Sequence, residues 1–236
     1  MTNDKLWFRN ICKRNNFDIS EKQIDLLDAY VVRLLEWNSK INLISRRDEM
    51  NVWSRHILGS VAFLFRHNLK TPADIVDVGT GGGLPGVPLA IVLPGCRFTL
   101  VDSIQKKLLA LKDILSHLEL SNAGIMCGRA EDLSTKKPLN HAFDYVIARA
   151  VAPMKDIVKW SSGFLKPVQA GPEEGRGEFH LGPGAILLLK GGDLESELNH
   201  VKVKMNPRIL HSYSLPIEGF DTSSDLTDKK LVVVYP

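Results

Sequence analysis

The feature that most constrains the fold of this chain is a glycine-rich segment that directly follows a short apolar run. Residues 73–78 read ADIVDV, as expected for a buried parallel strand, and residues 79–83 read GTGGG. Glycines there let the backbone turn tightly and approach a ligand closely, and a following helix offers free N–H groups to an anionic part of that ligand. We therefore expect a strand, a ligand-binding loop and a helix over residues 86–93, with Pro88 in its first turn.

After this unit, apolar runs of strand length alternate with longer segments of helical periodicity. Further strands are predicted at residues 97–102, 123–128, 143–150, 184–192, 207–215 and 229–235, the last two as an antiparallel pair at the sheet edge. Helices are predicted at residues 104–118, 154–165 and 193–203. This alternation predicts an α/β fold with a doubly wound, seven-stranded, mostly parallel Rossmann-like sheet that has helices on both faces.

Residues 1–72 precede this alternation and are predicted to form an N-terminal helical extension. Within it, residues 20–40 have apolar side chains at helical spacing, and Ser20 with Gln23 forms the pattern of a capping box. A second helix is predicted over residues 51–69.

Residues 73–236 are predicted to form the main domain. Within it, residues 168–183 include six Gly or Pro among sixteen residues, which predicts a flexible insertion.

Charge and composition limit the function more than the fold. The net charge is +3, and the positive excess lies in the N-terminal extension, with 12 Lys and Arg against 8 Asp and Glu. This asymmetry points weakly to a polyanionic partner, although charge alone favours a solvated helical surface. No apolar run approaches the roughly 18 residues of a membrane helix, and no signal peptide is visible. The three cysteines form no CxxC pair or disulfide framework, so we expect a cytoplasmic protein.

The spacing of the glycines distinguishes between two kinds of cofactor. A dinucleotide pattern, GxGxxG, matches at Gly81, Gly83 and Gly86, but it begins four residues beyond Asp77, too far from the strand end for the usual tight turn. The form acidic-x-Gly-x-Gly-x-Gly, which runs from Asp77 through Gly79 to Gly83, instead suits S-adenosylmethionine. The alternative is a structural turn without a ligand.

Acidic residues end or follow the next two predicted strands at the same sheet edge. Asp102 lies 25 residues after Asp77 and is placed to accept hydrogen bonds from both ribose hydroxyls of an adenosine. The alternative role of Asp102 is a helix N-cap. Taken alone, the residue fits both roles equally, and the nearby glycine segment favours ribose binding. Residues 128–132, GRAED, follow the next strand, where backbone and carboxylate groups could read an adenine edge.

The residues after the fourth predicted strand indicate the type of reaction. Arg149 ends that strand, where the reacting centre of such sheets lies, so it is a candidate for substrate recognition; the alternative is a surface ion pair. No Asn/Asp-Pro-Pro-aromatic tetrad follows, no cysteine nucleophile lies there, and no His/Cys/Asp cluster has metal-ligand spacing. His56 and His67 are interpreted as structural or solvent-exposed. Direct transfer to an already nucleophilic atom remains, and guanine N7 fits because its lone pair needs no deprotonation.

Six segments together resemble one known family. They are LLEWNSKINLIS (34–45), RHILGS (55–60), DVGTGGGLPGVPLAIV (77–92), GRAED (128–132), ARAVAP (148–153) and LLLKGG (187–192). In this order they resemble the bacterial small-subunit ribosomal RNA guanine-N7 methyltransferases, also called glucose-inhibited division protein B. The resemblance implies a class I methyltransferase fold, S-adenosylmethionine as cofactor, and 7-methylguanosine in 16S ribosomal RNA as product, with no metal and no membrane partner.

The resemblance, together with the positive charge of the N-terminal extension, implies roles for individual residues. The expected cofactor contacts are Gly79, Thr80, Gly81, Gly83, Leu84, Asp102, Ala130, Glu131 and Arg149, and the last is also the candidate catalytic residue. The expected RNA contacts are Arg46, Arg47, Arg55, Arg129, Lys190 and Lys229. The chain departs from the family pattern at Gly59, where the family usually has Asp, and at Lys229 and Lys230, where it often has an arginine.

Three other functions stay open at this point, the third more distant than the first two. One is an S-adenosylmethionine-dependent methyltransferase that acts on a small molecule or a protein. Another is a non-catalytic RNA-binding factor on the same fold, and the third is a nicotinamide dehydrogenase. The sequence does not distinguish free ribosomal RNA from an assembled small subunit as the substrate.

Overall fold

Apolar runs rich in Val, Ile and Leu form the central sheet, as the alternation predicts. The computed structural model describes residues 3–149, 151–167, 180–220 and 228–236. Seven strands pair in the order β4-β3-β2-β5-β7-β9-β8, and β9 runs antiparallel to both of its neighbours while the other pairs are parallel. The strands are β2 (Asp74–Val78), β3 (Arg97–Asp102), β4 (Ala123–Cys127), β5 (Tyr145–Arg149), β7 (Ala185–Gly191), β8 (Ile209–Ser214) and β9 (Lys229–Tyr235). The predicted doubly wound sheet and its antiparallel edge pair are confirmed.

Strand β2 lies where the strand order reverses. It pairs with β3 on one side and β5 on the other, so that Asp77 lies between Leu100 and Ile147. The loops that follow β2 and β3 run to one side, and those that follow β5 run to the other. Ligands of open α/β sheets bind in the crevice that such a reversal opens at the carboxyl ends of the strands. The glycine segment directly follows β2 at this crevice.

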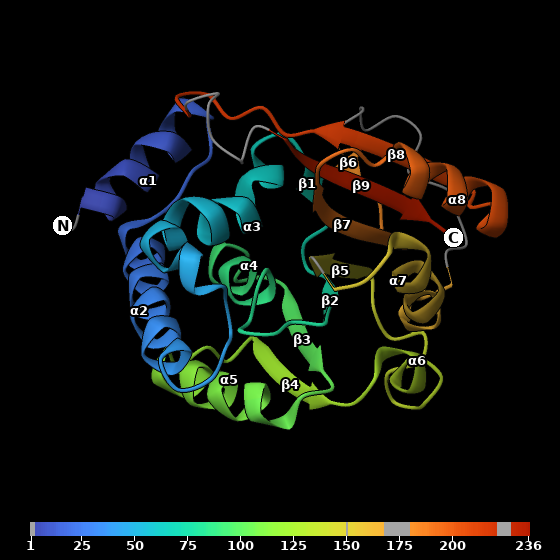
Figure 1. Ribbon diagram of the computed structural model, residues 1–236, viewed down its shortest axis with the longest axis horizontal. Helices are drawn as coiled ribbons and strands as arrows, with labels where there is room; N and C mark the ends of the chain where they lie inside the picture. Colours follow the sequence, from blue (N-terminus) through green and yellow to red (C-terminus); the bar gives the residue numbers. More distant parts are fainter. Residues whose placement is uncertain (1–2, 150, 168–179, 221–227) are drawn as a thin grey trace.

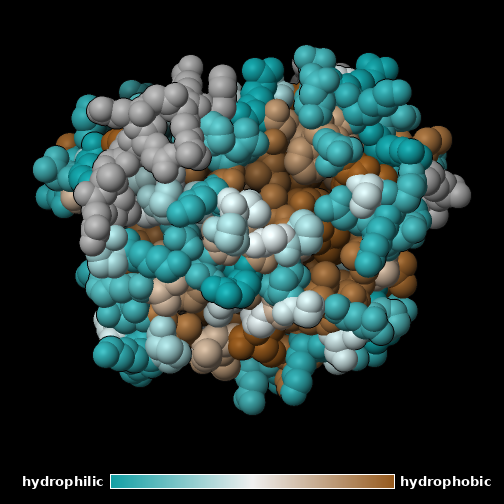
Figure 2. Space-filling view, turned by 180° about the vertical axis from the view of Figure 1, so that it is seen from behind, coloured by the Kyte–Doolittle hydropathy of each residue, from teal (hydrophilic) through white to brown (hydrophobic). Residues whose placement is uncertain are grey.

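Helices cover both faces of the sheet (Figure 1). One apolar cluster joins one face to the N-terminal helices, α4 (Gly86–Val92) and α5 (Gln105–His117). A second cluster joins the other face to α6 (Ala130–Leu133), α7 (Met154–Ser161) and α8 (Glu195–Met205). The predicted helices after β2, β3, β5 and β7 are confirmed. The face turned away in Figure 1 has hydrophilic margins, with apolar side chains gathered toward its middle (Figure 2).

Two regular helices begin the described chain. These are α1 (Asn3–Arg14), which the sequence patterns did not predict, and α2 (Glu21–Asn38). The capping box of α2 is confirmed, because the Gln23 backbone N–H donates to the Ser20 hydroxyl and the Gln23 side chain accepts from the Ser20 N–H. Buried side chains of both helices belong to the apolar cluster that also contains the core of α4 and α5.

The single helix predicted over residues 51–69 is wrong. The segment instead consists of a 3₁₀ helix η1 (Arg46–Asn51), a π-helix η2 (Val52–Leu58), one α-turn α3 (Gly59–Val61) and a second 3₁₀ helix η3 (Ala62–Phe65). β-Branched, aromatic and glycine residues such as Val52, Trp53 and Gly59 are weak helix formers, so tertiary packing sets the backbone here. The chain then enters the short strand β1 (Asn68–Leu69).

The predicted insertion is only partly within the described structure. Residues 168–179 lie outside the described residues. Residues 180–181 form strand β6 (His180–Leu181), which pairs in parallel with β1, and the Tyr145 hydroxyl connects the two by accepting from Lys70 N–H and donating to the Leu181 carbonyl. Across the described ranges, no helix has both the length and the apolar character that a membrane span requires.

Candidate functional site

The glycine segment between β2 and α4 has a backbone that only glycine adopts at low cost. Gly79, Gly81 and Gly83 have φ values of +70°, +58° and +99°. In this left-handed region an L residue costs about 1–2 kcal/mol. The N–H groups of Gly79 and Thr80 donate to the Val101 carbonyl at 2.8 and 2.9 Å, which ties the segment to β3. The sequence thus fixes a tight loop at the crevice.

Asp77, in β2, holds this loop through hydrogen bonds to both of its ends. Its side chain is fully buried, and its Oδ2 accepts from the Thr80 hydroxyl at 2.6 Å and from the Gly86 N–H at 3.0 Å. Its Oδ1 is buried without a hydrogen-bond partner among the described residues. Burial raises the pKa of Asp77 to about 6. A Cβ at Gly86 would lie 2.6 Å from Asp77 Oδ2, so glycine is required where α4 begins.

Asp102 links the loop to the turn after β3. Its Oδ2 accepts from the Gly81 N–H at 2.9 Å and its Oδ1 from the Ile104 N–H at 2.8 Å. Ile104 itself is the N-cap of α5, so the alternative interpretation of Asp102 as the helix cap is wrong. A carboxylate has about four acceptor positions, so two stay available on Asp102 for a ligand.

A first cavity of about 200 Å³ opens at the ends of β3 and β4, beside this loop. It brings together four of the predicted cofactor residues, Gly79, Asp102, Ala130 and Glu131, and also Arg129. The remaining lining residues are Val78, Val101, Ser103, Gly128, Val151 and Trp160. The lining of this cavity therefore combines carboxylates and backbone groups with the Val151 and Trp160 side chains.

The other residues predicted for the cofactor lie around this cavity and do not line it. Thr80 and Leu84 are buried. Gly83 packs against α4 and α5, since a Cβ there would lie 2.6 Å from Val87 Cγ2 and 2.9 Å from Leu111 Cδ1. A Cβ at Gly81, in contrast, would meet only the Gly79 carbonyl oxygen, at 3.9 Å. Gly81 thus faces open space.

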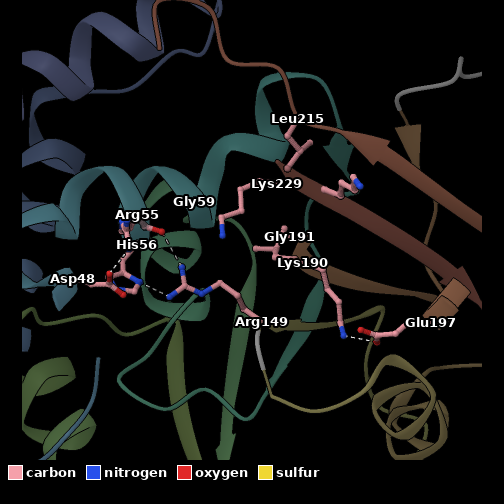
Figure 3. Close-up of a pocket in the computed structure, with 12 residues that line it drawn as sticks. Asp48, Arg55, His56, Gly59, Arg149, Lys190, Gly191, Glu197, Leu215 and Lys229 are labelled. Carbon is pink, nitrogen blue, oxygen red and sulfur yellow. Dashed lines mark hydrogen bonds and ion pairs between the residues drawn. The ribbon is translucent and has the colours of Figure 1, made fainter. Parts of the chain in front are cut away.

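A second cavity, of about 390 Å³, lies beyond the carboxyl ends of β5 and β7 (Figure 3). Five basic and two acidic side chains line it, together with His56 and four other residues. These residues are Asp48, Arg55, His56, Gly59, Arg149, Leu189, Lys190, Gly191, Glu197, Leu215, Lys229 and Lys230. The surplus of positive charge suits an anionic ligand. Four predicted contacts, Arg55, Arg149, Lys190 and Lys229, meet in this cavity.

Arg149 extends from the end of β5 toward η2 (Figure 3). Its Nη2 lies 2.7 Å from His56 Nδ1, and its Nη1 donates to the Arg55 carbonyl at 3.4 Å. Burial lowers the pKa of Arg149, yet a guanidinium stays charged at neutral pH. The alternative of a surface ion pair is wrong, because the Arg149 partners are an imidazole and a carbonyl.

His56 lines the second cavity, although the sequence did not single it out as a candidate. Its side chain is 12% exposed, so the interpretation as a solvent-exposed histidine is wrong, while the structural interpretation stays a prediction. Burial lowers the pKa of His56 to about 4, and the neighbouring Arg149 contributes to that shift. The only signal in the sequence was its position beside Arg55, within the segment RHILGS.

The predicted RNA contacts have different surroundings. Lys190 Nζ pairs with Glu197 Oε2 at 2.6 Å and donates to the Ala152 carbonyl at 3.3 Å, so its ammonium is held within the protein. Arg55 Nη1 pairs with Asp48 Oδ1 at 2.7 Å. Lys229 begins β9, at the cavity wall.

Three further arginines lie outside the second cavity. Arg46 and Arg47 are exposed at the start of η1, and Arg46 lines a separate shallow depression formed by residues 38–42. Arg129 is exposed at the rim of the first cavity, with its Nη1 3.9 Å from Glu131 Oε1. Among the residues that the structure describes, no cluster of His, Cys, Asp and Glu could hold a metal ion.

Comparisons with known proteins agree on one family. Residues 23–171 match the GidB family, described as rRNA small subunit methyltransferase G. A protein named ribosomal RNA small subunit methyltransferase G from Chlorobium limicola is 37% identical over 90% of this chain and 87% of its own length. One of the same name from Bacteroides fragilis is 34% identical over 92% and 94%, respectively.

Solved structures confirm the class I methyltransferase fold at low sequence identity. A precorrin-6y C5,15-methyltransferase from Geobacter metallireducens has a TM-score of 0.50 and 12% identity, over 83% of this chain and 92% of that one. TYW2 from M. jannaschii, solved in complex with AdoMet, has a TM-score of 0.50 and 14% identity, over 77% and 74%. These likenesses concern the fold alone.

Proposed function

The chain belongs to the rRNA small subunit methyltransferase G family, and from this premise we propose that it transfers a methyl group from S-adenosylmethionine to N7 of a guanosine in 16S ribosomal RNA. The observation that carries the proposal is the position of Arg149. Its guanidinium lies in a basic cavity at the end of β5, and two residues later Val151 lines the cavity beside the glycine loop. A cofactor site and an anion site therefore flank one short segment.

The first cavity fits the adenosine part of S-adenosylmethionine. The two free acceptor positions of Asp102 suit the ribose hydroxyls, and the Ala130 N–H and the Glu131 carboxylate suit the adenine edge. The open space beside Gly81 lets the remainder of the cofactor pass close to the backbone. When bound, S-adenosylmethionine supplies a methyl group that its cationic sulfonium already activates.

The second cavity fits a nucleotide of RNA. Arg55, Lys229 and Lys230 give it a positive wall, and phosphate contacts from such residues position a nucleic acid without reading its sequence. A target guanine has to leave its stack to reach Arg149, as bases in single-stranded RNA loops can. The exposed Arg46, Arg47 and Arg129 extend the positive surface beyond the two cavities.

The residues present suit a reaction that needs no general base. Guanine N7 carries a free lone pair, so this chain has to align the base and exclude water rather than remove a proton. A guanidinium has five N–H groups, and Arg149 commits two of them to His56 and to the Arg55 carbonyl. Another of its N–H groups is suited to bind guanine O6. It would not donate to N7, because that would occupy the attacking lone pair.

Methyl transfer to small ribosomal subunits that lack this modification tests the proposal. With labelled S-adenosylmethionine, we expect the label in 16S RNA, at one guanosine that becomes sensitive to borohydride and aniline cleavage. Label in protein or in a metabolite would instead support the other methyltransferase alternatives. Binding of both ligands without turnover would support a non-catalytic RNA-binding factor.

A further inference from the structure

The guanidinium of Arg149 contacts the His56 imidazole, and Asp48 lies on the far side of that imidazole. His56 Nδ1 lies 2.7 Å from Arg149 Nη2, and because a guanidinium can only donate, Nδ1 has to be the acceptor. The proton of the imidazole is therefore on Nε2, which lies 3.5 Å from Asp48 Oδ2. Asp48 is fixed in turn by Arg55, whose Nη1 is 2.7 Å from Asp48 Oδ1. Figure 3 shows Arg149, His56 and Asp48 in a row at one wall of the cavity.

The charges around His56 keep this arrangement in one protonation state. Arg149, Arg55 and Lys229 disfavour an imidazolium, and Asp48 alone favours it, while burial disfavours any charge. The net result lowers the pKa of His56 to about 4, so the imidazole is neutral near pH 7. A neutral His56 with its proton on Nε2 can only accept from Arg149.

A neutral acceptor has a consequence that a carboxylate would not have. Arg149 is already coupled electrostatically to Asp77 and Asp48, and direct pairing with either carboxylate would offset its positive charge. Pairing with a neutral imidazole holds the guanidinium in place and leaves its charge available to the ligand. His56 lies on the π-helix η2, and π-turns of this kind occur frequently at functional sites.

We propose that His56 is a positioning residue of the methyl transfer, which holds the Arg149 guanidinium toward the target base through its unprotonated Nδ1 and does not neutralise it. Asp48 Oδ2, 3.5 Å from Nε2, attracts the imidazole electrostatically, although Nε2 has no hydrogen-bond partner among the described residues. The inference deepens the proposed function and rests on it for its kinetic readout, while the state of the imidazole can be measured without any substrate.

The kinetic test uses variants that differ in the acceptor alone. His56→Ala should lower kcat on unmodified small subunits about 10- to 100-fold, the scale of a misplaced group at a reacting centre, with little change in S-adenosylhomocysteine affinity. His56→Asn has an oxygen near the place of Nδ1 and should recover most of that loss. His56→Asp accepts as well but neutralises Arg149, so it should stay as slow as His56→Ala. Thermal melts check that each variant is folded.

A double variant tests whether His56 acts through Arg149. Arg149→Ala combined with His56→Ala should be no slower than Arg149→Ala alone, because the positioned group is already absent. Additive losses, or equal kcat for folded His56→Ala and His56→Asn, would overturn the proposal. Wild-type protein that methylates no subunit would instead refute the proposed function.

The substrate-free measurement is ¹⁵N NMR of the imidazole. We expect His56 to be in the Nε2–H form and to titrate near pH 4, and we expect Arg149→Ala to move its pKa upward. An Nδ1–H form, or a pKa at the ordinary histidine value of about 6.5, would overturn the proposal whatever the substrate is.

Discussion

Gly81→Ala separates a ligand-contacting role of the glycine segment from a conformational one. Gly81 has φ +58°, where an alanine costs about 1–2 kcal/mol, and its Cβ would meet only the Gly79 carbonyl oxygen at 3.9 Å. No clash adds to that cost, so the variant should fold with a Tm lower by about 2–8 °C. The added methyl group projects into open space beside the loop. If the cofactor passes there, S-adenosylhomocysteine affinity should fall at least about tenfold, or about 1.4 kcal/mol.

Gly192→Ala is the matched control for this substitution. Gly192 has φ +83°, and a Cβ there would have Asp228 Oδ2 as its nearest neighbour, at 4.0 Å. The backbone cost is therefore similar, but the residue is outside the first cavity. Calorimetry with S-adenosylhomocysteine should give wild-type affinity for Gly192→Ala and a weakened affinity for Gly81→Ala. Equal affinities in two folded variants with similar losses of Tm would refute the proposed path of the cofactor.

Three further perturbations test other parts of the site. Asp102→Ala should lose about 1.5–3 kcal/mol of cofactor affinity, and an unchanged ligand-induced shift in Tm would contradict ribose binding. Burial raises the pKa of Asp77 from 3.8 to about 6, so its ionisation should cost the folded ligand-free protein roughly 3 kcal/mol as pH rises from 4 through 6. The free energy of unfolding, measured with denaturant at each pH, should show no such decline for Asp77→Asn. Parallel curves of this free energy against pH for the wild type and the variant would refute the reasoning. Removal of Arg46 and Arg47 together should weaken RNA binding and flatten the slope of log affinity against log salt concentration by about one to two units. Removal of Lys202 and Lys204, in the last turn of α8, should change neither.

The sheet and the loop at the carboxyl end of β2 were predictable because they depend on short-range patterns. Strand β2, the glycine segment and Asp102 follow from apolar runs that end in residues with special backbone or hydrogen-bonding properties. Arg149 was also predictable, since the end of a central parallel strand faces the crevice in any sheet of this order. The capping box of α2 is equally local, because its two members are three residues apart.

The partners of these residues were not predictable, because tertiary packing selects them. The irregular helices η1 and η2 place Asp48 and His56 beside Arg149, and no helical period in the sequence indicates a π-turn. The family resemblance makes Lys190 an expected RNA contact, yet Glu197 on α8 holds its ammonium. Pairings such as these depend on elements that are distant in sequence, so a pattern can identify the strand end but not the group that meets it there.

The N-terminal extension lines the second cavity and contacts the glycine loop beside the first, so it is more than an appendage to the sheet. From α2, the buried Tyr30 hydroxyl donates to the Gly82 carbonyl at 2.9 Å, which ties the glycine loop to this helix. At the end of the same helix, Asn38 Oδ1 accepts from the Leu43 and Ile44 N–H groups, and its Nδ2 donates to Glu49 of η1 at 2.6 Å.

One helix therefore supports the glycine loop from its middle, through Tyr30, and the segment that carries Asp48 from its last residue, Asn38. The domain boundary at residue 72 stays a prediction from sequence pattern, but it does not separate two cores, because α1, α2, α4 and α5 share one apolar cluster. A displacement of α2 would reach both the Gly82 carbonyl and the Asp48–His56 contact. In the proposed reaction, the positions of the two reactants consequently depend on the same packing interface, which gives the extension a part in aligning them.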